Sequence, residues 1–169
     1  MLQFEIENHC RNLIGFPLNE IGRNSNMVWF GFGKSITTVN KRGDSFKSSE
    51  FVLHIQCTWR LIKENKIITA SRDIYVPKSN WNSDNEFDWD IIGENRFDEL
   101  LKDFLKKYCG KIYIILLNSD PLGGLRISFT DNISLEIFPD ESTEEEFWRI
   151  FTPGKLDSHF VVTGLGIEK

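Results

Sequence analysis

The sequence predicts an α+β domain in which a mainly antiparallel, twisted sheet carries helices on one face. Segments rich in β-branched and aromatic residues are frequent, and they do not alternate regularly with helices as a doubly wound α/β fold requires. One segment near residue 100 also has clear amphipathic helical spacing. The 169-residue chain has no internal repeat or obvious linker, so we expect a single globular domain over residues 1–169.

Two helices are predicted. Near the N-terminus apolar residues recur at helical spacing until Gly15 and Pro17 end the pattern, and these residues are Leu2, Ile6, Cys10, Leu13 and Ile14. A longer helix is predicted over 96–108, with Asn95 as its N-cap and Gly110 as its stop. Its apolar stripe consists of Phe97, Leu100, Leu101, Phe104, Leu105 and Tyr108.

Strands are predicted over 27–33, 51–61, 67–76, 111–118, 124–130, 134–139 and 159–163. The segment 147–151 is ambiguous. Ser142 with Glu145 has the spacing of a capping box, which favours a helix, whereas Trp148 and Ile150 alternate as in a strand. We favour a short strand there.

The stretch LHIQCTWRL, residues 53–61, brings a histidine, a cysteine and an arginine close together in the sequence. Because successive side chains of a strand point to opposite faces, these residues separate into two rows. The core row is Phe51, Leu53, Ile55, Cys57, Trp59 and Leu61, and the polar row is His54, Gln56, Thr58 and Arg60. Cys57 is therefore expected in the core as a small hydrophobe, pointing away from His54.

A tight turn at Glu64 and Asn65 would pair the strand 51–61 with 67–76. This register predicts Trp59 opposite Ala70, Ile55 opposite Ile74, Gln56 opposite Asp73 and His54 opposite Tyr75. It also places Arg72 on the core face opposite Cys57, which is unfavourable for a cation.

A second hairpin has a clearer register. A three-residue loop of Thr130, Asp131 and Asn132 matches apolar with apolar residues, pairing Leu125 with Ile137, Ile127 with Leu135 and Phe129 with Ile133. Asn132 suits the left-handed position that such loops need. The same register places Arg126 opposite Glu136 as a cross-strand ion pair.

Composition and motifs exclude several classes of protein. The three cysteines are widely spaced and form no CxxC pair, and His9, His54 and His159 are isolated, so we predict no disulfide framework, no metal site and no cofactor. GFGKS at 31–35 lacks the first glycine of a phosphate loop, and DNEFDWD lacks the glycine and glutamate of a calcium loop. No apolar run spans a membrane and no signal peptide is evident, which predicts a cytoplasmic protein.

The net charge of −5 is unevenly distributed. Between Asp84 and Asp103 eight carboxylates face only Arg96 and Lys102, and residues 140–146 add five carboxylates without a base. This pattern disfavours nucleic acid as a partner and is compatible with a basic protein partner or with a solvated acidic face. The long loop 77–95 overlaps the first acidic region, and its Trp81 and Trp89 are candidate anchors for a partner.

Several blocks of the sequence resemble an uncharacterised family of bacterial proteins of similar length. The blocks are LHIQCTWR, FDWD, GGLRISFTDN, SLEIFPDES, EFWRIF and HFVVTG, in this order, and they cover most of the chain from about Met27 onward. The resemblance implies a bacterial cytosolic single domain and no established activity. Members of the family often have proline after the cysteine, where this sequence has Thr58.

Two functional hypotheses follow. The first is a non-enzymatic protein-binding domain of the immunity or antitoxin kind, which uses the acidic and aromatic segments and has no catalytic residues. The second is a small-ligand-binding protein or enzyme that uses the polar face of the sheet. Its candidate binding residues are His54, Gln56, Arg60, Asp73, Arg126, Glu136, Arg149 and His159. A sheet with one solvated side is the alternative to both, and the oligomeric state is not predicted.

Overall fold

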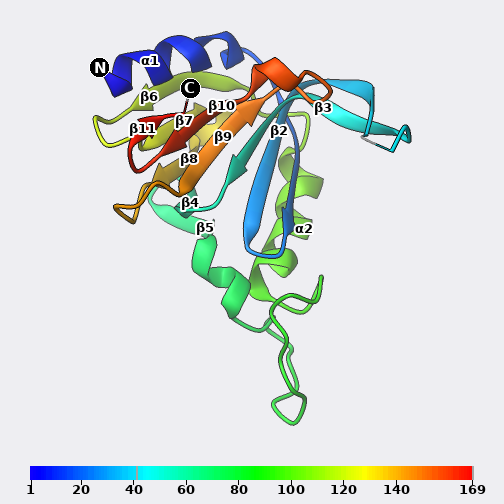
Figure 1. Ribbon diagram of the computed structural model, residues 1–169. Helices are drawn as coiled ribbons and strands as arrows, with labels where there is room; N and C mark the ends of the chain where they lie inside the picture. Colours follow the sequence, from blue (N-terminus) through cyan, green and yellow to red (C-terminus); the bar gives the residue numbers. More distant parts are fainter. Residues whose placement is uncertain (41, 169) are drawn as a thin grey trace.

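The computed structural model describes residues 1–40 and 42–168. Within this part, the chain forms an α+β fold with two antiparallel sheets and two α-helices (Figure 1). One sheet has six strands in the order β1-β2-β3-β9-β10-β11, and the other has five in the order β5-β4-β8-β7-β6. The predicted fold class is confirmed.

The strands agree with most of the predicted segments. The six-stranded sheet contains β1 (Leu18–Asn24), β2 (Met27–Val39), β3 (Ser45–Ile55), β9 (Glu146–Phe151), β10 (Phe160–Thr163) and β11 (Gly166–Ile167). The five-stranded sheet contains β4 (Thr58–Lys63), β5 (Lys66–Ala70), β6 (Ile114–Ser119), β7 (Leu125–Phe129) and β8 (Ile133–Phe138). The ambiguous segment 147–151 is a strand, whereas β1, β11, the second half of β2 and the first half of β3 were not predicted.

Both predicted helices are present. α1 (Leu2–Cys10) continues into a 3-10 turn, η1 (Arg11–Leu13), and buries Ile6 and Cys10. α2 (Arg96–Tyr108) has the predicted bounds, and the side chain of Asn95 accepts a hydrogen bond from the backbone N–H of Asp98. α1 packs beside β6, and α2 packs beside β1 and β5, so α2 contacts both sheets.

LHIQCTWRL does not form one continuous strand. β3 ends at Ile55 in one sheet and β4 begins at Thr58 in the other, while the backbone N–H groups of Gln56 and Cys57 both donate to the carbonyl oxygen of Phe147. The alternation of faces nevertheless continues across the break. Leu53, Ile55, Cys57, Trp59 and Leu61 are all buried, as the core row predicted.

The predicted pairing of 51–61 with 67–76 is wrong except at the turn. Lys63 pairs with Lys66, but a register shift between Leu61 and Ile62 places Arg60, not Trp59, opposite Ala70. Residues 71–75 form a 3-10 helix, η2 (Ser71–Tyr75), so the pairs of Ile55 with Ile74, Gln56 with Asp73 and His54 with Tyr75 do not exist. Arg72 is exposed, which removes the unfavourable core position that the predicted register gave it.

The predicted register of β7 and β8 is confirmed in every pair. Leu125 faces Ile137, Ile127 faces Leu135, Phe129 faces Ile133 and Arg126 faces Glu136. Residues 130–132 form η3 (Thr130–Asn132), in which Asp131 and Asn132 have positive φ angles of 60° and 56°. Both residue types tolerate this left-handed conformation.

The core lies between the two sheets and beneath α2. Trp59 of β4 contacts Phe30 of β2 and Phe97 of α2 edge to face, with ring centroids 6.0 and 5.6 Å apart, and thereby joins both sheets to the helix. A second contact between the sheets joins Phe32 to Phe129. None of the described helices is both long and apolar enough to cross a membrane.

Candidate functional site

The polar row of LHIQCTWRL is divided between two sheets. His54 lies on β3 of the six-stranded sheet and Arg60 lies on β4 of the five-stranded sheet. Gln56 is exposed in the break between them, and Thr58 donates to the carboxylate of Asp140 through its backbone N–H and its hydroxyl. The eight candidate binding residues therefore do not converge on one site.

Three of the candidates form a group on the outer face of the five-stranded sheet. Glu136 is only 8% exposed and accepts Arg60 Nε at one carboxylate oxygen, while Arg126 NH1 lies 3.0 Å from the other. The guanidinium group of Arg60 also lies over the Phe138 ring, 5.0 Å from its centroid. Because both carboxylate oxygens are occupied and both arginines are about half exposed, this group stabilises the sheet modestly, by about 1 kcal/mol or less per pair.

Three further candidates group on the outer face of the six-stranded sheet. Arg149 on β9 forms a two-point ion pair with Glu146, which raises the pKa of its guanidinium group, and Arg149 NH1 lies 3.4 Å from His159 Nδ1. The Phe151 ring stacks on His159 and meets the His54 ring edge to face. Burial, reinforced by the charge of Arg149, lowers the pKa of His54 and favours its neutral form.

Asp73 has a structural role. Its carboxylate accepts hydrogen bonds of 3.0 Å from the backbone N–H of Ala70 and from the hydroxyl of Thr69, and it lies 3.8 Å from Arg96. These bonds turn the chain out of β5 into η2. Asp73 therefore starts the path that leads into the loop 77–95.

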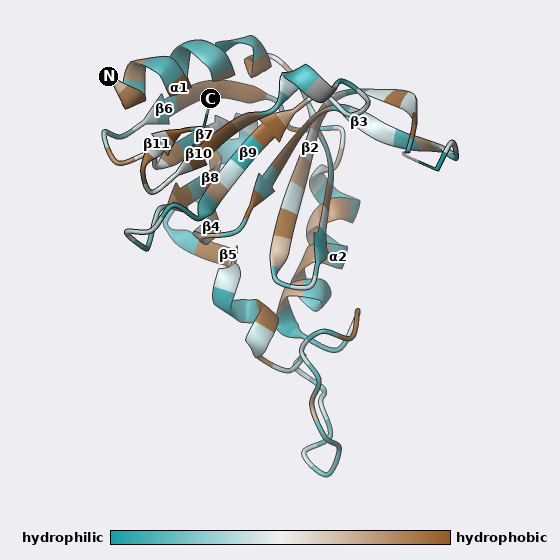
Figure 2. Cartoon of the chain, in the orientation of Figure 1, coloured by the Kyte–Doolittle hydropathy of each residue, from teal (hydrophilic) through white to brown (hydrophobic). Residues whose placement is uncertain are grey.

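The loop 77–95, named the acidic loop from here on, extends away from the rest of the molecule (Figure 1). It contains five carboxylates and one lysine, a net charge of −4, and Asp84, Glu86, Asp88 and Asp90 are exposed. Figure 2 shows most of this loop in the colours of polar residues. Its two ends are joined by a bridge between Pro77 and Asn95 and by a hydrogen bond from Lys78 N–H to the Glu94 carbonyl oxygen.

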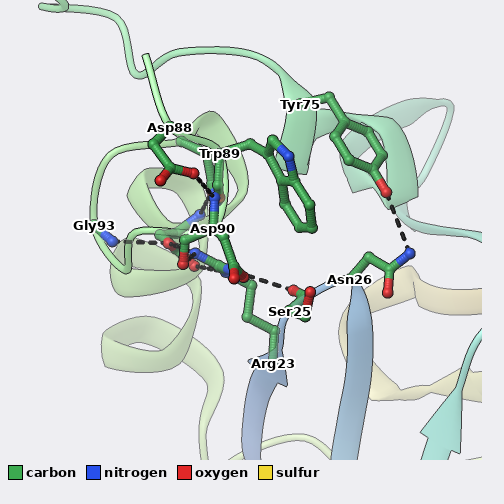
Figure 3. Close-up of polar contacts among 10 residues, drawn as sticks. Arg23, Ser25, Asn26, Tyr75, Asp88, Trp89, Asp90 and Gly93 are labelled. Carbon is green, nitrogen blue, oxygen red and sulfur yellow. Dashed lines mark hydrogen bonds and ion pairs between the residues drawn. The ribbon is translucent and has the colours of Figure 1, made fainter. Parts of the chain in front are cut away.

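A buried arginine holds the base of the acidic loop. The side chain of Arg23 on β1 is 1% exposed and lies beside Asp90 of the loop (Figure 3). Its Nε and NH2 atoms each lie 2.9 Å from a different oxygen of Asp98. Arg23 also donates to the carbonyl oxygens of Ser25 and Asp90. Asp98 in turn accepts from the backbone N–H of Gly93. The loop base is thus fixed to both β1 and the start of α2.

Trp89 faces the body of the molecule rather than solvent. Its ring packs against the core and meets the Tyr75 ring at a centroid distance of 5.0 Å, and its carbonyl oxygen accepts from the side chain of Asn95 (Figure 3). Tyr75 accepts a hydrogen bond from Asn26 at the β1–β2 turn. Of the two predicted anchors, Trp89 belongs to the base of the loop.

Trp81 lies in the outer part of the acidic loop. It packs edge to face on Phe87 with ring centroids 5.5 Å apart, and its indole N–H donates to the carbonyl oxygen of Asn85. Both rings are partly exposed, and the ammonium group of Lys78 lies over the Trp81 ring, 5.9 Å from its centroid. Asp84, Glu86 and Asp88 are exposed nearby in the sequence. The outer loop therefore presents a preformed aromatic pair in an acidic setting.

The thiols do not form a nucleophilic site. Burial raises the pKa of both Cys10 and Cys57 to about 12, so these groups stay protonated at neutral pH. Across residues 1–40 and 42–168, no three His, Cys, Asp or Glu side chains are arranged to hold a metal ion.

Sequence reasoning identified the acidic loop and its aromatic residues but missed Arg23. Its partner Asp98 lies 75 positions away, and no local pattern links the two.

Comparisons of the chain with protein-family models, curated proteins and solved structures found no match.

Proposed function

We propose that this protein is a non-enzymatic, cytosolic protein-binding domain of the immunity or antitoxin kind, which binds a basic protein through the acidic loop. The observation that carries the proposal is the exposed acidic loop on a base fixed by the buried Arg23–Asp98 pair. Long loops in compact domains are commonly functional, and this one is both charged and anchored.

The fixed base supports binding because it reduces the entropy that the loop loses when a partner docks. Arg23, Asn95 and Asp98 hold the C-terminal end of the loop at Trp89, Asp90 and Gly93, and the N-terminal end is joined to it by the bridge of Pro77 with Asn95. The Trp81–Phe87 contact lies in the outer part. A loop whose ends are held in this way has less backbone freedom to lose when a partner docks.

Charge and apolar surface have separate roles in this proposal. The exposed carboxylates attract a basic surface and accelerate association, an effect that salt weakens. Trp81 and Phe87, together with Ile91 and the 68% exposed Ile92, offer apolar area that a partner can bury. The acidic loop therefore carries exposed carboxylates and apolar side chains on one segment, which suits a basic partner that also has an apolar contact surface.

The test is affinity capture from the native host with three forms of the protein. The wild type is compared with a loop variant, Asp84→Asn with Glu86→Gln, and with a control variant, Glu144→Gln with Glu145→Gln, in the other acidic segment. All four carboxylates are exposed, so neither variant should disturb the fold.

We expect a basic protein to be captured by the wild type and the control variant and to be lost or strongly reduced with the loop variant. The captured protein should dissociate at raised salt. Capture of the same proteins by the loop variant, or no enrichment by the wild type over a blank matrix, would contradict the proposal.

A further inference from the structure

A second surface, remote in sequence from the acidic loop, is hollowed into a groove. It lies on the outer face of the six-stranded sheet and has a volume of about 490 Å³, compared with about 250 Å³ for the cavity beside Arg126 and Glu136. We name it the aromatic groove. It is lined by Trp29, Phe46, Val52, His54, Phe151 and Pro153, together with several polar residues that include Glu20 and Lys47. Neither helix lies across this face in Figure 1.

Two glycines and a β-bulge shape the lining of the groove. The indole of Trp29 lies over Gly22, where a Cβ would come within 2.2 Å of the ring, and Glu20 occupies the space over Gly31 in the same way. The glycines therefore let these two lining side chains lie close to the sheet. A register shift between Phe32 and Ser35 interrupts the β2–β3 pairing, and Phe46 lies beyond it on β3, within the lining.

The lining of the groove includes a polar side chain, His54, whose ring makes no hydrogen bond to the rest of the described chain. His54 lies between Trp29 and Arg149 on adjacent strands, and no hydrogen bond to its ring is found among the described residues. Since burial and Arg149 favour the neutral imidazole, the ring has one N–H donor and one nitrogen acceptor. A ligand with a hydrogen-bonding edge would satisfy one of them.

The charges of the lining select the class of ligand. Glu20 and Lys47 contribute one charge of each sign, so with His54 neutral the lining has no net charge. Glu20 is already engaged by the backbone N–H and hydroxyl of Ser49. Such a lining favours an uncharged occupant over a phosphate or a dication, and its aromatic walls favour a planar one.

We propose that the aromatic groove binds a planar, uncharged heteroaromatic ring of about the size of a purine. The ring lies against Trp29, Phe46 and Phe151, and its polar edge bonds to the neutral His54. The volume is within the range of about 300–1,000 Å³ typical of small-ligand sites. This inference does not depend on the acidic loop or on its partner.

The experiment titrates the whole protein with adenosine and with indole and follows the indole N–H resonance of Trp29 and the ring resonances of His54. Cyclohexanol, which is uncharged but not planar, is the control probe. We expect saturable shifts with at least one heteroaromatic probe and none with cyclohexanol. A lack of saturable shifts with both heteroaromatic probes overturns the proposal.

Three variants test the location and the hydrogen bond. Ser48→Trp places a large side chain in the groove and should abolish binding, whereas Ser45→Trp, on the same strand but outside the lining, should not. His54→Phe keeps an aromatic ring at this position but removes its hydrogen bond to the ligand, so it should weaken binding about tenfold. This variant also tests the location if Ser48→Trp fails to fold. Unchanged affinity in both Ser48→Trp and His54→Phe overturns the proposal. So does a Trp29 shift that follows protein concentration without probe, because a second copy would then occupy the groove.

Discussion

Arg23 shows how one side chain can fix the base of a long, exposed loop. A buried guanidinium group is tolerated only when its donors are satisfied, and here the partners are both oxygens of Asp98 and two carbonyl oxygens. One of those carbonyls belongs to Asp90 within the acidic loop. The stability of the domain and the position of the loop therefore depend on the same residue.

Arg23→Met should lower the free energy of unfolding by about 3–5 kcal/mol, because it leaves Asp98 without its charged partner in a mostly buried position. Amide hydrogen exchange in the acidic loop should also accelerate. Urea unfolding and exchange measurements test both effects.

Arg72→Met is the matched control for this prediction, since Arg72 is exposed on the nearby η2, and it should change the stability by less than about 0.5 kcal/mol. Adding Asp98→Asn to Arg23→Met should recover part of the loss, because the unpaired charge is removed. Equal effects of Arg23→Met and Arg72→Met would refute the role given to Arg23.

His54 should make stability depend on pH. Burial holds its folded-state pKa below the ordinary value of 6.5, so the unfolded chain binds the proton first as the pH falls. Stability should therefore decrease as the pH falls below 6.5 toward the folded-state pKa. Urea unfolding from about pH 8 to about pH 5 should show a smaller decrease in His54→Gln than in the wild type.

His9 contributes in the same direction, because burial lowers its pKa as well. A His9→Gln, His54→Gln double variant should therefore have a flatter profile than either single variant. If the profile of His54→Gln coincides with that of the wild type, the assignment of the neutral imidazole is incorrect.

At the scale of elements, the sequence predicted the register of a strand pair correctly where loop length and apolar alternation alone determine it. The β7–β8 register follows from a short loop and strict apolar alternation, and all its predicted pairs are present. The β4–β5 register failed because a bulge at Leu61 and Ile62 shifts the pairing and because Asp73 turns the chain into η2. Bulges and side-chain caps of this kind depend on contacts that alternation does not encode.

Substitutions of Asn132 test the conformation of the β7–β8 loop, because the φ angle of this residue is 56° and lies in the left-handed region. Asn132→Gly should keep or slightly raise the stability, whereas Asn132→Ala should lower it by about 1 kcal/mol, since alanine is strained in this conformation. Thermal unfolding of the two variants measures the difference. Similar melting temperatures for both would show that the loop relaxes to another turn.

At the scale of the whole molecule, the sequence predicted the α+β class and both helices but not the division into two sheets. The alternation of LHIQCTWRL continues through the break at Gln56 and Cys57, so its pattern is that of an unbroken strand. Because of this division, His54 lies near Arg149 and His159 in one sheet. Arg60 lies near Arg126 and Glu136 in the other. The division into two sheets is set by long-range pairing, of β3 with β9 in the six-stranded sheet and of β4 with β8 in the five-stranded sheet.

The shared core predicts that the two sheets unfold together. Ile55 in the six-stranded sheet and Ile127 in the five-stranded sheet are both fully buried, so Ile55→Val and Ile127→Val form a matched pair. Each should lower the free energy of unfolding by about 0.5–1.5 kcal/mol. Because Trp59 and the Phe32–Phe129 contact join the sheets, each substitution should reduce amide protection in both. Loss of protection confined to the substituted sheet would show instead that the two sheets are separate cooperative units.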